Sequence, residues 1–439
     1  MALPLILANV TTPILGLVDT AILGRMEEVH YFAGAAIGSL IVTQIYWLCG
    51  FLKMSVTGLS AQTKNAEPHM QIKVLIQGAA LSLLLAFCIL LLQQAIVQAG
   101  LFFSDVSAQI ASSTQDYFFV RIWGAPAAML NLVIVGWLVG QHKTKLVLIL
   151  QVLINVINIA ASLLFVYVFD WGVKGVAGAT TCAEYMMLIL GVYFIFKHYS
   201  GQSKLKLSVD KRHELTARLR RWLNYKSMQS LLSLNSNIFI RNLALQFVIA
   251  FIMLRGAHFG AEAVAVNAII LQFFTLIALG LDGVANGVEA LIGEAKGDNN
   301  IAKIHQNFKI GLVWSSIFAI LYALVFYFLD SPIVNLLSDH ANIRSAMQSY
   351  SNIIVWLPII AHWCFLMDGV FVGLSKGAAM RTSMLVSTCL VFIPFYLVFS
   401  EQGNMAMWIA MLAFLASRGI TQGTYYYYWT YYKPQNFIQ

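Results

Sequence analysis

A single apolar stretch near the start of the chain decides its fold class: Leu3-Pro4-Leu5-Ile6-Leu7-Ala8-Asn9-Val10-Thr11-Thr12-Pro13-Ile14-Leu15-Gly16-Leu17-Val18-Asp19-Thr20-Ala21-Ile22-Leu23. It is long enough to cross a bilayer, which takes about 20 mostly apolar residues. Its one acid, Asp19, costs about 2.5–3.5 kcal/mol at such a position on insertion scales, and an acid kept at that cost is a candidate functional residue. The alternatives are a structural acid paired with a basic neighbour, and an acid that reaches the aqueous interface from the helix end.

The rest of the composition also indicates a membrane protein. Of the 439 residues, 59% are hydrophobic and only 10% are charged, whereas soluble domains carry about 25% charged residues. Twelve apolar stretches recur at about 2–23, 32–52, 72–101, 115–139, 146–169, 174–196, 232–255, 262–290, 304–329, 346–372, 382–400 and 405–428. Runs of this length cross lipid as helices. The sequence therefore predicts an all-α integral membrane protein with twelve transmembrane helices.

The distribution of charge orients these helices. The net charge is +8, and the lysines and arginines gather in the loops after every second span and in residues 201–230. The other loops are acidic or nearly uncharged. By the positive-inside rule, both termini and residues 201–230 are predicted to be cytoplasmic. The basic run is interpreted as an anchor to anionic lipid rather than a nucleic-acid site.

The two groups of six spans are similar to each other. Gly34-Ala35-Ala36-Ile37 and Val266-Asn267-Ala268-Ile269 occupy equivalent places 232 residues apart, each near the start of a span that is followed by a short polar loop. Because six is even, both halves share one orientation, as parallel repeats related by a pseudo-two-fold axis along the membrane normal. We predict an N-lobe over residues 1–200, a cytoplasmic linker over 201–230 and a C-lobe over 231–439.

Several polar residues are predicted to share the interior of the N-lobe. Their spacing places them on single faces of their helices, and they are Asn9, Thr12, Asp19, Tyr117, Arg121, Asn155, Asn158 and Glu184. At a rise of about 1.5 Å per residue, all of these except Asn9 and Thr12 are expected near one depth in the outer half of the lobe. Hydrogen bonds that merely hold helices together would explain the asparagines as well as a site does. They explain two acids beside one base less well.

The C-lobe carries its own buried charges. Arg241 and Arg418 stay protonated and need carboxylate partners in lipid, and the candidates are Asp282, Glu289 and Asp368. We expect a structural network of ion pairs here, with a cation site as the alternative.

Motifs for catalysis and metal binding were interpreted as absent. Residues 373–377 match G-x-S-x-G but occupy a short loop between helices, not the strand-to-helix turn that the motif requires. There is no P-loop and no H-E-x-x-H, and an intramembrane hydrolase would need a nucleophile–base pair that the spans lack. The sequence predicts no enzyme, no metal site and no cofactor.

Motifs in both halves carry a family resemblance. They are Gly16-Leu17-Val18-Asp19-Thr20-Ala21, Lys53-Met54-Ser55-Val56-Thr57-Gly58-Leu59-Ser60-Ala61-Gln62, Arg121-Ile122-Trp123-Gly124-Ala125-Pro126-Ala127, Gly136-Trp137-Leu138-Val139-Gly140, Ala183-Glu184-Tyr185, Ala265-Val266-Asn267-Ala268, Leu281-Asp282-Gly283, Val288-Glu289-Ala290 and Asp368-Gly369-Val370-Phe371-Val372-Gly373. Together they resemble the multidrug and toxic compound extrusion (MATE) family, DinF branch.

The resemblance implies an exporter of lipophilic, often cationic compounds, coupled to inward flow of H⁺ or, alternatively, Na⁺. It implies Asp19 as the protonation site, with Asn155 and Asn158 as its partners. In Na⁺-coupled relatives, acids of the C-lobe serve instead. We expect a monomer in the inner (plasma) membrane, with the bilayer and small molecules as its partners. A flippase for lipid-linked precursors and a non-transporting scaffold are the remaining alternatives.

The first span is also the predicted moving part. Pro4 and Pro13 lack the backbone N–H that would complete the helix ladder, and Gly16 adds freedom between them and Asp19. We expect protonation of Asp19 to bend this helix and displace the cargo.

Overall fold

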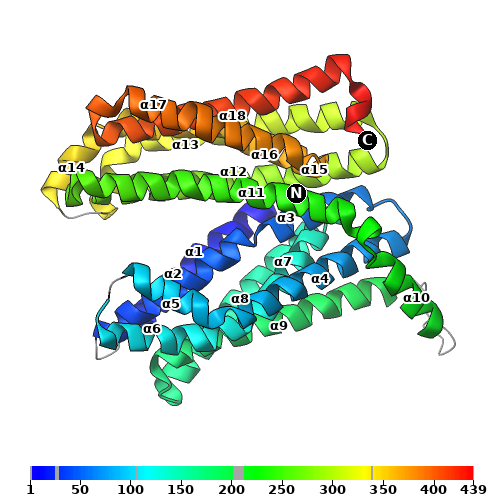
Figure 1. Cartoon of the computed structure of the whole chain (residues 1–439), viewed down its shortest axis with the longest axis horizontal. Helices are drawn as coiled ribbons and strands as arrows, with labels where there is room; N and C mark the ends of the chain where they lie inside the picture. Colours follow the sequence, from blue (N-terminus) through cyan, green and yellow to red (C-terminus); the bar gives the residue numbers. More distant parts are fainter. Residues whose placement is uncertain (1, 25–28, 105, 201–211, 338–339, 439) are drawn as a thin grey trace. The chain divides into compact units, whose positions relative to one another are not determined.

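The structure, a computed structural model, describes residues 2–24, 29–104, 106–200, 212–337 and 340–438, without the side chains of 12–15, 17, 29, 103, 198–200, 212–216 and 337. Helices and short connections account for all of these residues, and no strand occurs among them (Figure 1). The predicted all-α class is confirmed.

The chain divides into two compact units. One comprises residues 7–60 and 66–232, and the other comprises 1–6, 61–65 and 233–439; they are called the N-unit and the C-unit below. The N-unit contains most of α1 (Ala2–Leu23) and of α3 (Phe51–Gln62), together with α2 (Val29–Leu48), α4 (Pro68–Leu91), α5 (Gln93–Ser104), α6 (Ala108–Arg121), η1 (Ile122–Gly124), α7 (Ala125–Gly140), α8 (Thr144–Leu163), η2 (Leu164–Val168), α9 (Gly172–Ser200) and α10 (Arg212–Trp222). The C-unit contains most of α11 (Tyr225–Gly256), then η4 (Ala257–Phe259), α12 (Ala261–Gly297), α13 (Ile301–Leu337), α14 (Ala341–Gln348), α15 (Ser351–Gly373), α16 (Gly377–Val386), η5 (Ser387–Phe392), α17 (Ile393–Val398), η6 (Ser400–Gln402), α18 (Asn404–Tyr432) and η7 (Pro434–Phe437).

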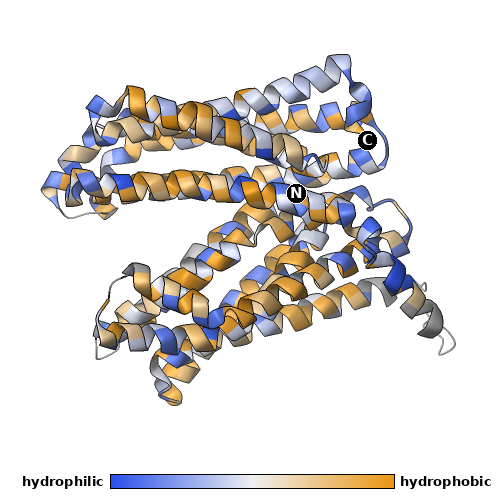
Figure 2. Ribbon diagram, viewed as in Figure 1, coloured by the Kyte–Doolittle hydropathy of each residue, from blue (hydrophilic) through white to orange (hydrophobic). Residues whose placement is uncertain are grey.

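The long helices coincide with the predicted spans. Within the described ranges, 10 helices are long and apolar enough to cross a membrane. The first and last predicted spans correspond to α1 and α18, which are 22 and 29 residues long. Figure 2 shows hydrophobic residues along many of the long helices, whereas the C-terminal half of α18 is more polar. Several spans are composite: the fourth, for example, consists of α6, η1 and α7, and Pro126 stands in the first turn of α7, where its missing N–H is tolerated.

Two short segments of the predicted N-lobe belong to the C-unit, and residues 231–232 of the predicted C-lobe belong to the N-unit. Residues 1–6 and 61–65 lie in the C-unit, although the prediction placed residues 1–200 together. Residues 61–65 belong to the C-unit because of an ion pair and a hydrogen bond. Lys64 Nζ lies 3.0 Å from Glu294 Oε1, and Gln62 Nε2 donates to the Gly373 carbonyl at 2.8 Å. Of the predicted linker, residues 201–211 lie outside the described residues, and the part from Arg212 onward forms α10 and the start of α11.

Close helix packing in the N-unit leads to a prediction at Gly136 of α7. A Cβ at this position would lie 2.5 Å from the Lys53 carbonyl oxygen of α3, a backbone atom with little freedom to move. Gly136→Ala should therefore destabilise the protein by about 1–3 kcal/mol through overpacking, measured as a lower melting temperature in detergent. Gly178→Ala is the matched control, because a Cβ there meets its nearest neighbour at 3.7 Å. Equal melting temperatures for both variants would contradict this packing.

Candidate functional site

The strongest buried contact in the N-unit joins Arg121, at the end of α6, to Glu184 of α9. Arg121 Nη1 donates to Glu184 Oε2 at 2.8 Å, and Nη2 donates to Oε1 at 2.5 Å. The pair is therefore bidentate, the geometry in which guanidinium and carboxylate match best. Asn131 of α7 donates to the Glu184 carbonyl at 2.8 Å, and the guanidinium lies 5.1 Å from the Tyr46 ring centroid. The Arg121 guanidinium and the Glu184 carboxylate therefore neutralise each other.

Asp19 lies beside this pair without joining it. Its half-buried side chain projects from the last two turns of α1, with the Ser162 hydroxyl of α8 as a polar neighbour and Arg121 as a cation that acts on it. Its Oδ1 atom is buried and has no hydrogen-bond partner among the described residues. An unsatisfied buried oxygen is costly for a carboxylate. Asp19 is thus an acid with spare capacity to bind a proton or a cation.

A line of polar side chains continues from Asp19 along α8 to α9. Ser162 Oγ donates to Asn158 Oδ1 at 3.2 Å, and Asn158 Nδ2 donates to Thr180 Oγ1 at 3.0 Å. Thr180 then donates to the Val176 carbonyl at 3.2 Å. Because hydroxyls both donate and accept, this line can adjust when the charge of Asp19 changes.

The structure places the remaining predicted N-lobe residues at different levels. Tyr117 is buried next to Asp19 and Arg121. Asn155 Nδ2 instead donates to the Thr11 carbonyl at 3.1 Å, about 12 Å along α1 from Asp19. Asn9 stands about 15 Å from Asp19 on the same helix. The side chains of Thr12 and Pro13 lie outside the described part of the chain, while Pro4 and Gly16 lie within the continuous helix α1.

In the C-unit, one buried acid holds two arginines. Asp368 of α15 accepts hydrogen bonds from Arg241 of α11 and, at 2.7 Å, from Arg418 of α18. Gln422, one turn beyond Arg418, donates to the other carboxylate oxygen at 2.9 Å. The side chain of Asp368 is only 6% exposed. The cluster therefore has the character of a structural ion-pair network.

The other predicted acids of the C-unit have different surroundings. Both lie on α12, where Asp282 is exposed and Glu289 is 1% exposed. Among the residues that the structure describes, no group of three or more His, Cys, Asp or Glu side chains is placed to hold a metal ion.

Two contributors to these clusters had not been singled out from the sequence. Gln422 follows Arg418 by four residues, so a search for i, i+4 polar pairs on one helix face would have found it. Tyr46 offers no such signal, because one aromatic residue in an apolar span is ordinary.

Comparison with known proteins identifies the family. A model of the MatE family matches residues 4–164 and again residues 238–398. The chain belongs to the MatE family. Two matches to one model also confirm that the halves are repeats. The predicted resemblance to the DinF branch is confirmed by the DNA damage-inducible protein F of Escherichia coli K12, which is 32% identical over 96% of this chain and 89% of its own length. A probable multidrug resistance protein NorM of Idiomarina loihiensis is 22% identical over 74% of this chain and 69% of its own.

Solved structures share this fold. A MATE crystal structure in the bent conformation superposes with a TM-score of 0.86, at 15% identity, covering 100% of this chain and 96% of that one. A mutant of a Vibrio cholerae MATE transporter gives a TM-score of 0.80 at 18% identity, covering 99% and 96%. This MatE chain is therefore a multi-pass membrane transporter and not an enzyme.

Proposed function

We propose that this MatE transporter exports lipophilic, often cationic compounds in exchange for protons, and that Asp19 binds the exchanged proton. One observation carries the proposal: of these two acids in the N-unit, Glu184 is held by the two terminal nitrogens of Arg121, while Asp19 retains a buried oxygen without a partner among the described residues. Protonating Glu184 would leave the Arg121 charge unpaired, which is strongly destabilising. Protonating Asp19 breaks no ion pair.

The proton and the cargo compete for the same charge. Deprotonated Asp19 favours water and a cationic guest in its surroundings, because an unpaired carboxylate in lipid is costly. Once protonated, Asp19 is neutral and no longer needs water or a cationic guest. The Ser162 hydroxyl can then turn to accept a hydrogen bond from the protonated carboxyl. The line through Asn158 to Thr180 then adjusts with it. Proton binding thereby favours cargo release.

Helix α1 is the element that we propose bends. Its residues up to Ile6 belong to the C-unit, whereas those from Leu7 onward belong to the N-unit. Any movement of one unit relative to the other must therefore deform α1. Pro4 and Pro13 lie on either side of this change and weaken the helix ladder there.

Proton coupling is preferred to the Na⁺ alternative because Asp368, a buried acid of the C-unit, already has its partners. Its two oxygens accept bonds from two guanidinium groups and one amide. Two fixed positive charges at one carboxylate repel a further cation. The name of the NorM relative, a probable multidrug resistance protein, supports drugs as the cargo class over lipid-linked precursors.

The proposal includes a placement in the cell. The excess of Lys and Arg in alternate loops supports the inner (plasma) membrane with both termini in the cytoplasm. We propose that the transporter works there as a monomer.

The test uses the purified chain in proteoliposomes with an imposed pH gradient and choline in place of Na⁺. Vesicles about two pH units more acidic inside should accumulate a cationic dye by on the order of 100-fold at one proton per cargo, since each pH unit provides about 1.4 kcal/mol. Protein-free vesicles are the control. A requirement for a Na⁺ gradient, with no response to the pH gradient alone, would contradict the proposal.

A further inference from the structure

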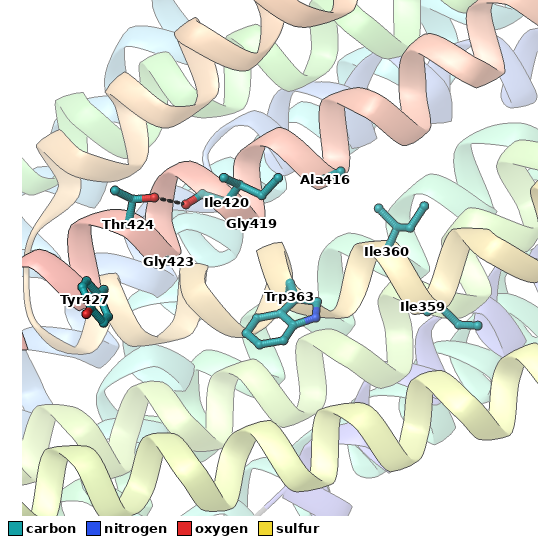
Figure 3. Close-up of a pocket in the computed structure, with 9 residues that line it drawn as sticks. All are labelled: Ile359, Ile360, Trp363, Ala416, Gly419, Ile420, Gly423, Thr424 and Tyr427. Carbon is teal, nitrogen blue, oxygen red and sulfur yellow. Dashed lines mark hydrogen bonds between the residues drawn. The ribbon is translucent and has the colours of Figure 1, made fainter.

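A cavity lies within the C-unit. It is a groove of about 560 Å³ between α15 and α18, lined almost entirely by apolar side chains (Figure 3). Trp363 of α15 borders it, and Ala416, Ile420 and Tyr427 line it along α18. Nothing in the transport chemistry derived above uses this groove.

Two glycines of α18 create the hollow. Gly419 and Gly423 both line the groove, and their missing side chains leave the space open. A Cβ at Gly419 would lie 3.0 Å from Trp363 Cβ, so this position sets how closely the two helices pack. At Gly423 the nearest atom to such a Cβ is 4.0 Å away. A larger side chain at Gly423 could therefore fill the groove without displacing the backbone.

The length and position of the groove match one leaflet of a bilayer. From Ala416 to Tyr427 the helix rises about 16 Å, and half of a hydrocarbon core about 30 Å thick is about 15 Å. The groove ends at Tyr427, whose ring lies 4.5 Å from that of Tyr431 between centroids in a tilted arrangement, within a run of aromatic residues. Such runs mark the level of the lipid headgroups.

Lysines gather at this same end. Lys376 Nζ lies 5.7 Å from the centroid of the Trp429 ring, and Lys433 Nζ lies 5.8 Å from that of Tyr428. In the described part of the chain neither lysine forms an ion pair with a carboxylate. Lys296 adds a third charge close to Lys376, and its own ammonium donates to the Leu374 carbonyl at 2.8 Å. These unneutralised charges are complementary to an anion.

Partial burial strengthens that argument at Lys376. Loss of solvation lowers the pKa of this amine, because the charged form is less stable away from water. A phosphate at headgroup level would supply the missing partner. An apolar groove one leaflet deep, with unpaired cations at its headgroup end, matches the two ends of an acidic phospholipid.

We propose that this groove binds one anionic phospholipid, with an acyl chain between α15 and α18 and the headgroup at Lys376 and Lys433. The lipid belongs to the leaflet that contains the end of α18. Each lysine near the surface favours an anionic lipid by roughly fivefold. Annular lipid, by contrast, would bind without regard to its headgroup.

Trp363 provides the readout, because bromine on an acyl chain quenches a neighbouring indole. The full chain is reconstituted with brominated phosphatidylglycerol or brominated phosphatidylcholine in unlabelled bilayer lipid. Since the chain has 10 tryptophans, the Trp363 signal is the difference from Trp363→Phe. We expect half-quenching at a mole fraction of the anionic lipid about fivefold or more below that of the zwitterionic lipid.

Three variants separate the two parts of the site. Gly423→Leu should remove the quenching of Trp363 by either lipid, because the added side chain fills the groove. Lys376→Gln with Lys433→Gln should keep the quenching but remove the anionic preference. Lys145→Gln, an exposed lysine of the N-unit, should change neither. Equal quenching by both lipids in the unmodified chain would overturn the proposal. So would full quenching in Gly423→Leu, or a Trp363 that no lipid reaches because a drug or a second copy covers it.

Discussion

Replacing Asp19 with asparagine is expected to abolish proton-driven accumulation of cargo while leaving the protein folded. Under a gradient of about two pH units, accumulation should fall from on the order of 100-fold to nearly equal concentrations on the two sides. The asparagine amide keeps the size of the side chain and can still bond with Ser162, but it cannot bind and release a proton. Uptake of a cationic dye into acid-loaded proteoliposomes measures the loss.

The matched control is Asp116→Asn on α6 of the same unit. Asp116 is half exposed and pairs with Lys174 at 3.1 Å, so its loss should cost little in stability and nothing in coupling. If Asp19→Asn accumulated dye as well as Asp116→Asn, another group would carry the proton.

The second large effect is expected at Asp368. Asp368→Asn leaves Arg241 and Arg418 buried without a carboxylate, since both donate to this one side chain. Removing one partner of a buried ion pair costs about 3–5 kcal/mol. The melting temperature in detergent should therefore fall by on the order of 10 °C.

Glu262→Gln is the control for this measurement, because Glu262 is an exposed acid in the first turn of α12. It should change stability by no more than about 0.5 kcal/mol. If Asp368→Asn had the same melting temperature as Glu262→Gln but had lost transport, Asp368 would take part in coupling and would not be structural.

The chain of apolar stretches was sufficient to predict the helical architecture and the repeat, because lipid permits so few alternatives. It also predicted Asp19 as a candidate, since one acid in an apolar helix stands out by its cost. The sequence could not assign the partners of the buried charges. Spacing along one helix does not determine which other helix packs against it. The ion pair between Arg121 and Glu184 could therefore be assigned only from the structure.

Depth along the helices was the second limit of the prediction. Asn155 and Asn158 share one face of α8, and both were expected near Asp19. In the structure Asn158 connects to the Asp19 neighbour Ser162, while Asn155 reaches the backbone of Thr11, about two turns away along α1. A small tilt of one helix shifts such levels by several ångströms, and periodicity contains no information about tilt.

Protein in detergent at mildly acidic pH offers the most direct test of Asp19 as the exchanged proton site. Adding a saturating cationic drug to weakly buffered protein should release protons from the unmodified chain, because the guest and the proton compete for one carboxylate. The Asp19→Asn variant should bind the drug without releasing protons, whereas Asp116→Asn should release as many as the unmodified chain. Undiminished drug-driven proton release from Asp19→Asn would contradict the assignment.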